Sequence, residues 1–271
     1  MEVTLGVLYG PLLAVARRLT ARPSLQYWLL LAAVVLAHLL VLRVVERRPL
    51  AAVGLGRAAA RPRLLAAGAL LGAAAVGLPA ALLLAGGELR AVAAPAGSWA
   101  ATAGSLALAL APAALWEELL VRGYPLLVVT EALGAPLALL LTSVVFGALH
   151  LQNPNASLGS AAVVTLAGVF LGAIRFATGS LWAAFAAHLA WNWTLAAGFH
   201  AAVSGLPFPT PGYRVIDAGP DWLTGGPWGP EGGAAAVAGM LGGLALLWRR
   251  APRTTTMTPL LGGRGRRTHG I

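Results

Sequence analysis

The stretch WAATAGSLALALAPAALWEELLVRGYPLLVVTE, residues 99–131, decides the fold of this chain. It is apolar over most of its length, yet Glu117, Glu118 and Arg122 lie inside it. A charged side chain at membrane depth costs about 2.5–3.5 kcal/mol on insertion scales, so such residues are functional by default. We therefore expect a membrane helix that carries part of a polar site, either in one piece or in two pieces broken near Pro125.

Composition places the rest of the chain in the membrane as well. Of the 271 residues, 58% are hydrophobic and 10% are charged, whereas a soluble domain has about 25% charged residues. Only helices and closed barrels satisfy the backbone in lipid, and the apolar runs here are continuous rather than alternating. The sequence predicts an all-α, polytopic transmembrane bundle of about 7–8 membrane helices. The candidate spans are residues 27–45, 64–85, 99–131, 136–152, 160–175, 180–198 and 232–248.

Charge and cysteine content limit the kinds of partner and chemistry that we expect for this protein. The net charge is +10 and the chain has arginine but no lysine or cysteine. The arginines lie in short loops and tails beside apolar spans, as the positive-inside rule describes, so we expect a lipid bilayer as partner and no nucleic acid. The absence of cysteine excludes disulfides, a thiol nucleophile and cysteine metal sites. The arginine-only, alanine-rich usage is typical of a GC-rich bacterial genome, so we expect a multi-pass protein of the bacterial inner membrane.

The chain divides into three regions. Residues 1–26 are predicted to be an N-terminal interfacial or half-spanning segment, because their charges follow the apolar run instead of preceding it, unlike a signal peptide. Residues 27–250 form the transmembrane domain, with a motif core at about residues 100–200. Residues 251–271 are an Arg-, Thr- and Gly-rich tail that we expect to be disordered.

The longest predicted loop is residues 199–231. It contains six prolines and also Trp222 and Trp228. Because tryptophan favours the membrane interface, we expect this loop to lie on the headgroups or to cap the bundle.

Polar residues recur at helical spacing in three spans. Pairs four residues apart share one face of a helix: Glu118 with Arg122, Phe146 with His150, and His188 with Asn192. The turn at residues 133–136 lies midway between Glu117 and His150, so an antiparallel hairpin with a rise of about 1.5 Å per residue places the two level. A second turn near residues 178–180 brings His188 to a similar depth. We therefore expect an intramembrane polar cavity.

A carboxylate beside two imidazoles has two chemical uses. It can bind a metal with them, or it can act as a general base on water. Adjacent residues point about 100° apart on a helix, so we assign Glu117 as the base and Glu118 as the partner of Arg122. The plainer alternatives are a structural Glu118–Arg122 ion pair, a His150 bonded to a backbone carbonyl, and an Asn192 that joins helices. Phe146 and His38 are interpreted as packing and structural residues.

The three motifs together resemble one family. ALWEELLVRG (114–123), FGALH (146–150) and HLAWN (188–192) are similar to the EExxxR, FxxxH and HxxxN motifs of the CPBP family (CAAX protease and bacteriocin-processing, or Abi). Its members are intramembrane endopeptidases related to the type II CAAX prenyl endopeptidases. The likeness covers about residues 100–200 well and the flanking spans only loosely.

The resemblance implies a helical bundle with a conical cavity in the membrane and an enzyme that hydrolyses a peptide bond of a membrane-associated protein or peptide. Glu117 would activate the attacking water, His150 would assist it, and His188 with Asn192 would form an oxyanion hole. Glu118 and Arg122 complete the catalytic set. We favour no cofactor; a Zn²⁺ ion is the alternative, held by Glu117, His150 and His188, since asparagine is a poor zinc ligand.

Two other functions compete with the peptidase. One is a non-enzymatic membrane protein for bacteriocin self-immunity or scaffolding, which would bind a partner through the same cavity. The other is a small transporter or proton relay, because intramembrane Glu and His also mark ion paths. The lack of repeated halves in the sequence is evidence against transport.

Overall fold

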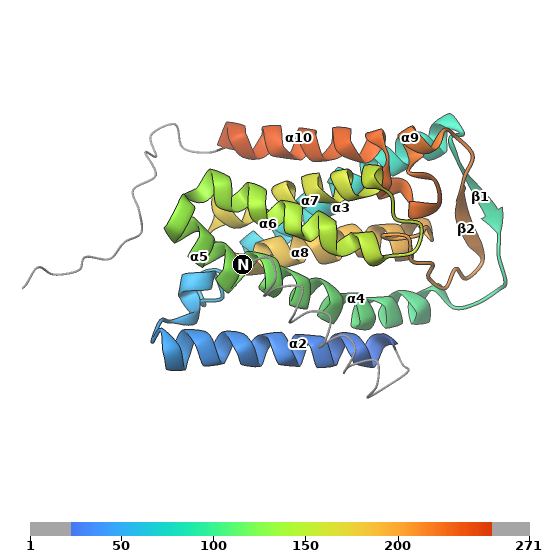
Figure 1. Ribbon diagram of the computed structural model, residues 1–271. Coiled ribbons are helices and arrows are strands. Elements are labelled where there is room, and N and C mark those ends of the chain that lie inside the picture. Colours follow the sequence, from blue (N-terminus) through green and yellow to red (C-terminus); the bar gives the residue numbers. More distant parts are fainter. Residues whose placement is uncertain (1–22, 251–271) are drawn as a thin grey trace, which may run out of the picture.

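The computed structural model describes residues 23–250, which form a bundle of α-helices (Figure 1). The all-α prediction is therefore confirmed. The helices are α2 (Pro23–Leu39), α3 (Pro62–Gly86), α4 (Trp99–Arg122), α5 (Tyr124–Leu133), α6 (Ala135–Leu149), α7 (Leu158–Thr178), α8 (Leu181–Trp193), α9 (Asp221–Thr224) and α10 (Ala234–Arg250). Two of them continue as π-helix, α2 over Leu40–Val45 and α8 over Thr194–Phe199. Four 3₁₀ turns accompany them, at Leu50–Val53, His150–Gln152, Gly226–Trp228 and Pro230–Gly232.

Five helical stretches within residues 23–250 are long and apolar enough to cross a membrane, compared with the 7–8 expected. They are Leu25–Val45, Pro62–Gly86, Trp99–Leu133, Ala135–Gln152 and Leu158–Thr178. Two of the expected spans are outside this set. The span expected at residues 232–248 is α10, which is a shorter apolar helix. The span expected at residues 180–198 is α8 with its π-helical continuation, which carries the polar residues His188 and Asn192.

The long span at residues 99–131 is two helices, as the proline suggested. The break falls at Gly123, between α4 and α5. Pro125 lies in the first turn of α5, where its missing N–H is tolerated, and its ring disfavours continuation of the preceding turn of α4. The freed N–H of Tyr124 donates to Nε2 of His38 on α2 (3.0 Å), while Nδ1 of His38 donates to the Val34 carbonyl (2.9 Å). His38 is therefore structural, as expected, and it joins α2 to the break.

Helix α8 lies in the middle of the bundle, and α3 packs closely along it (Figure 1). Gly68 and Gly72, one turn apart on α3, face the backbone of Ala183 and Ala187 on α8, and a Cβ at either glycine would overlap it. Small residues at this spacing let two membrane helices approach closely. The contact fixes α8, and α8 carries His188 and Asn192.

The loop at residues 199–231 has regular structure that the sequence did not predict. Its strand β2 (Tyr213–Asp217) pairs antiparallel with β1 (Leu89–Ala93), with Leu89 opposite Asp217 and Ala93 opposite Tyr213. The two strands lie across one end of the bundle (Figure 1), in agreement with the prediction that this loop caps the bundle. We refer to residues 199–231 as the cap. Trp222 is 70% exposed, but Trp228 is 2% exposed and packs inside the protein. The preference of tryptophan for the membrane interface therefore does not account for Trp228.

The domain boundaries remain predictions. Helix α2 begins at Pro23, four residues before the expected span. The predicted segment 1–26 falls mostly outside the described residues, and the predicted tail 251–271 falls wholly outside them.

Candidate functional site

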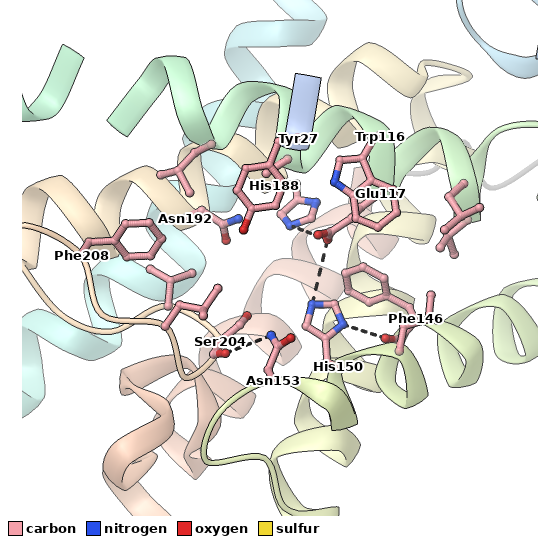
Figure 2. Close-up of a pocket in the computed structure, with 17 residues that line it drawn as sticks. Tyr27, Trp116, Glu117, Phe146, His150, Asn153, His188, Asn192, Ser204 and Phe208 are labelled. Atoms are coloured by element: carbon pink, nitrogen blue, oxygen red, sulfur yellow. Dashed lines mark hydrogen bonds and ion pairs between the residues drawn. The ribbon is translucent and has the colours of Figure 1, made fainter. Parts of the chain in front are cut away.

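A cavity of about 110 Å³ lies where α2, α4, α6, α8 and the segment after α8 meet (Figure 2). Four of the six predicted site residues line it, namely Glu117, His150, His188 and Asn192. The other two, Glu118 and Arg122, are buried behind its wall. The expectation that separate helices bring these groups to one depth therefore agrees with the geometry.

Glu117 lies between the two imidazoles. Its Oε2 is 4.0 Å from Nε2 of His150 and 3.8 Å from Nε2 of His188. These separations exceed a direct hydrogen bond. The Glu117 side chain is 22% exposed, compared with 12% for His150 and 8% for His188. The carboxylate is thus the most accessible of the three groups.

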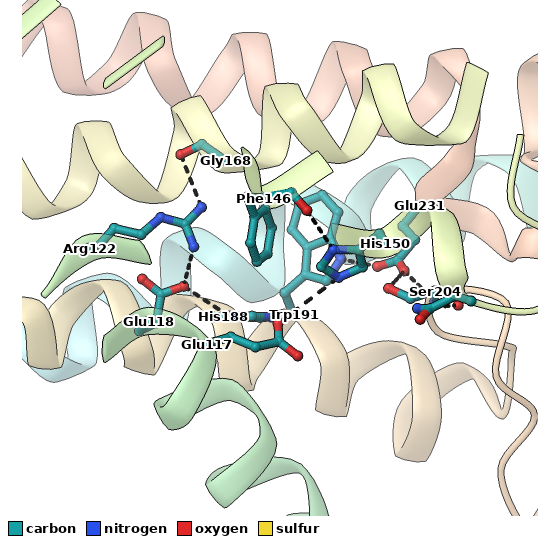
Figure 3. A network of polar contacts seen from close by, with 11 residues as sticks. Glu117, Glu118, Arg122, Phe146, His150, Gly168, His188, Trp191, Ser204 and Glu231 are labelled. Carbon is teal, nitrogen blue, oxygen red and sulfur yellow. Dashed lines mark hydrogen bonds and ion pairs between the residues drawn. The ribbon is translucent and has the colours of Figure 1, made fainter. Parts of the chain in front are cut away.

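His188 connects the two adjacent glutamates. Its Nδ1 donates to Oε1 of Glu118 (3.0 Å), which leaves Nε2 directed toward Glu117. The two carboxylates diverge as expected for adjacent residues on a helix, and Figure 3 shows them on opposite sides of the His188 ring. Glu118 therefore orients the imidazole, a role beyond the predicted pairing with Arg122.

The pairing with Arg122 is also present. Arg122 Nη1 donates to Glu118 Oε1 (2.9 Å), and neither side chain has any exposed surface. Arg122 Nη2 donates to the Gly168 carbonyl on α7 (3.3 Å), and the guanidinium lies 4.1 Å from the centre of the Phe146 ring. One side chain thus ties α4 to both α6 and α7 behind the cavity.

Phe146 and His150, four residues apart at the end of α6, are joined by a hydrogen bond. His150 Nδ1 donates to the Phe146 carbonyl (2.8 Å), as the plainer interpretation of His150 proposed. That bond fixes the ring so that Nε2 points at Glu117. The Phe146 ring makes edge contacts with both His150 and His188 at centroid distances of 4.6 and 5.9 Å. Phe146 is a packing residue, as expected, and it separates Arg122 from the cavity.

Several lining residues were not found from the sequence. Tyr27 and Trp116 contribute aromatic walls, and Asn153, Ser204 and Phe208 come from loops. Behind them, Glu231 is 7% exposed and bonded to Trp191. Two of these residues lie close in sequence to predicted site residues, since Trp116 directly precedes Glu117 and Asn153 follows His150 by three residues. The other loop residues reach the cavity only because the cap folds back on the bundle.

The metal alternative requires three convergent ligands. Within the part of the chain that the structure describes, no three His, Cys, Asp or Glu side chains converge closely enough to hold a metal ion. Two ligands about 2.0–2.2 Å from a tetrahedral zinc ion lie roughly 3.3–3.6 Å apart, whereas Glu117 Oε2 is 4.0 and 3.8 Å from the two imidazole nitrogens here. The present geometry therefore does not fit the proposed Glu117, His150 and His188 set, and the metal-free chemistry remains a prediction.

Comparison with known proteins identifies the segment that contains the three motifs. The family model "Type II CAAX prenyl endopeptidase Rce1-like" matches residues 98–194, from the start of α4 to the end of α8. The resemblance seen in the motifs is thereby confirmed over this segment, and the family is one of proteases. Neither the curated proteins nor the solved structures gave a match.

Proposed function

We propose that the protein is an intramembrane endopeptidase, because residues 98–194 match the family model of the Rce1-like type II CAAX prenyl endopeptidases. Its substrate is a membrane-associated protein or peptide, and its location is the bacterial inner membrane. The observation that carries the proposal is Glu117, which lies within 4.0 Å of both imidazoles at the surface of a cavity.

The proposed first step is the activation of water by Glu117 and His150. Because Nδ1 of His150 donates to a backbone carbonyl, Nε2 of the neutral ring is an acceptor. A water placed between the two groups donates one hydrogen bond to the Glu117 carboxylate and the other to Nε2 of His150. Its lone pairs then point into the cavity, toward the peptide carbonyl. Glu117 takes a proton as the water oxygen attacks the carbonyl carbon.

The proposed second step is the stabilisation of the negative oxygen that this attack creates. Asn192 offers its amide N–H, and His188 offers Nε2–H. Since Nδ1 of His188 already donates to Glu118, the ring can donate from Nε2 only when both nitrogens carry protons. The adjacent Glu118 carboxylate favours that charged form. Glu117 finally returns its proton to the leaving amine, so water has been added across the peptide bond.

The test is cleavage by the purified full-length protein in lipid vesicles. Membrane proteins from the host are offered to the wild type and to Glu117→Gln, and new peptide termini are identified by mass spectrometry. We expect termini that appear with the wild type and fall by about 10²–10⁴-fold with the variant, while thermal stability is retained. Equal cleavage by both proteins would refute the proposal. Binding of a partner without any cleavage would favour the scaffold or immunity function.

A further inference from the structure

The segment after α8 forms part of the cavity wall. Its contributions are Val203, Ser204, Leu206 and Phe208. Val203 and Leu206 exchange backbone hydrogen bonds of 3.0 and 2.9 Å. Between them, Ser204 and Gly205 have φ values of +50° and +76°, which is the signature of a two-residue hairpin turn. We refer to residues 203–206 as the cavity hairpin.

The cavity hairpin needs support from outside itself. A serine with positive φ is uncommon, and such backbone persists where surrounding contacts fix it. Gly205 N–H donates to the Trp228 carbonyl (2.9 Å), and Asn153 Nδ2 donates to the Ser204 carbonyl (3.0 Å). The backbone N–H and the hydroxyl of Ser204 both donate to the side chain of Glu231.

Glu231 receives three hydrogen bonds on its two oxygens. Oε1 accepts from the backbone N–H of Ser204 (2.5 Å) and from its hydroxyl (2.8 Å), and Oε2 accepts from Nε1 of Trp191 (2.5 Å). Figure 3 shows this second cluster beside the Glu117–His188–Glu118 cluster. Trp191 immediately precedes Asn192 on α8. The carboxylate therefore joins the cavity hairpin to the helix that carries two of the proposed catalytic residues.

A second, smaller cavity of about 30 Å³ lies between the two clusters. Its lining includes His150, His188 and Asn192 as well as Ser204 and Glu231. Within residues 23–250 no ion pair compensates Glu231. A carboxylate buried without a cation is costly unless its hydrogen bonds are complete. The hydrogen bonds from Ser204 and Trp191 therefore stabilise the buried carboxylate, and the same bonds fix the position of the cavity hairpin.

We propose that Glu231 is a positioning residue that fixes the cavity hairpin as a wall for the peptide substrate. The kinetic part of this inference rests on the proposed peptidase function, whereas the structural part does not. Leu206 is partly exposed in the cavity and can contact a bound peptide. The hairpin carries none of the four groups assigned to the chemistry. Loosening it should therefore weaken substrate binding more than it slows the bond-breaking step.

Glu231→Gln is the sharpest variant, because it keeps the size of the side chain. Glutamine has one acceptor oxygen, and its NH₂ group then faces an N–H donor from either Ser204 or Trp191. We expect KM to rise about 10-fold with kcat within about 3-fold of wild type, the pattern that follows from loss of binding shared by ground and transition states. Glu131→Gln, at a partly exposed ion pair with Arg48, is the control and should change neither constant.

Amide hydrogen exchange of the full chain in detergent measures the hairpin without requiring activity. We expect Glu231→Gln to accelerate exchange in peptides that cover residues 200–210 by about 10-fold or more, with α6 and α7 unchanged. Ser204→Ala and Trp191→Phe each remove one donor and should give smaller changes in the same peptides. They also keep the proposal testable if Glu231→Gln fails to fold.

The outcomes separate the two proposals. Unchanged exchange overturns the positioning role of Glu231. Faster exchange with an unchanged KM, or a lower kcat with an unchanged KM, overturns the role of the hairpin as a substrate wall. If the wild type cleaves no peptide, the proposed function fails while the exchange experiment still decides whether Glu231 holds the hairpin.

Discussion

Arg122→Ala should destabilise the fold strongly, because it leaves Glu118 as an uncompensated charge in a fully buried site. Both side chains have no exposed surface, and the pair is joined at 2.9 Å. Removing one partner of a buried ion pair costs about 3–5 kcal/mol. Loss of the cation–π contact between the Arg122 guanidinium and the Phe146 ring adds of order 1 kcal/mol to this destabilisation. The remaining bond from His188 to Glu118 offsets part of the total.

We therefore expect the free energy of unfolding to fall by about 3–5 kcal/mol, on the order of 10 °C in Tm for a chain of this size. The assay is thermal unfolding of purified protein in a mild detergent, followed by tryptophan fluorescence. Arg48→Ala is the matched control, since the Arg48–Glu131 pair at 2.6 Å is partly exposed and exposed pairs contribute little.

A double variant makes the reasoning stricter. Glu118→Gln combined with Arg122→Ala removes the charge that the single variant leaves unpaired, so the double variant should be more stable than Arg122→Ala alone. An Arg122→Ala protein as stable as Arg48→Ala would refute the argument. A double variant that simply adds the two single losses would refute it as well.

Three further predictions concern packing, the oxyanion hole and the metal. Gly72→Ala should destabilise the protein by about 1–3 kcal/mol in the same unfolding assay, because its Cβ would overlap the backbone of Ala187; Gly104→Ala, with open space around it, should be neutral or stabilising, and equal effects would contradict the close packing. Asn192→Ala should lower kcat by about 10²–10³-fold in the peptide assay with thermal stability retained, and an unaltered kcat would remove Asn192 from the oxyanion hole. Dialysis against a chelator should leave cleavage unchanged and elemental analysis should find less than one zinc per chain, whereas activity that disappears and returns with zinc would establish the metal alternative.

The predictable part of the site is the part whose geometry is local. Glu118 and Arg122 are four residues apart on one helix, and their contact follows from helical spacing alone. Glu117 and His150 lie at the same depth in the bundle because the turn between their helices is midway between them in the sequence. Gly134, with φ of +81°, lies at that turn. Pro125 predicted the break between α4 and α5 for an equally local reason.

The unpredicted part depends on contacts between distant residues. The pairing of β1 with β2 places Leu89 opposite Asp217, and no hydrophobic periodicity in either segment predicts a strand there. Glu231 reaches Ser204 and Trp191 only because the cap folds back onto α8. A proline-rich segment with two tryptophans predicts a loop that lies on the headgroups or caps the bundle. It does not predict that Trp228 is buried while Trp222 is exposed, because composition does not say which side of a loop faces the protein.

The most direct test of the shared site is the coupling between Glu117 and His150 in single-turnover cleavage. Rates are measured for the wild type, Glu117→Gln, His150→Ala and the double variant. If the carboxylate and the imidazole act on one water, the double variant will be no slower than Glu117→Gln alone, because groups that act as a unit are strongly non-additive. If the two losses multiply, the groups work independently and the single-site mechanism is wrong.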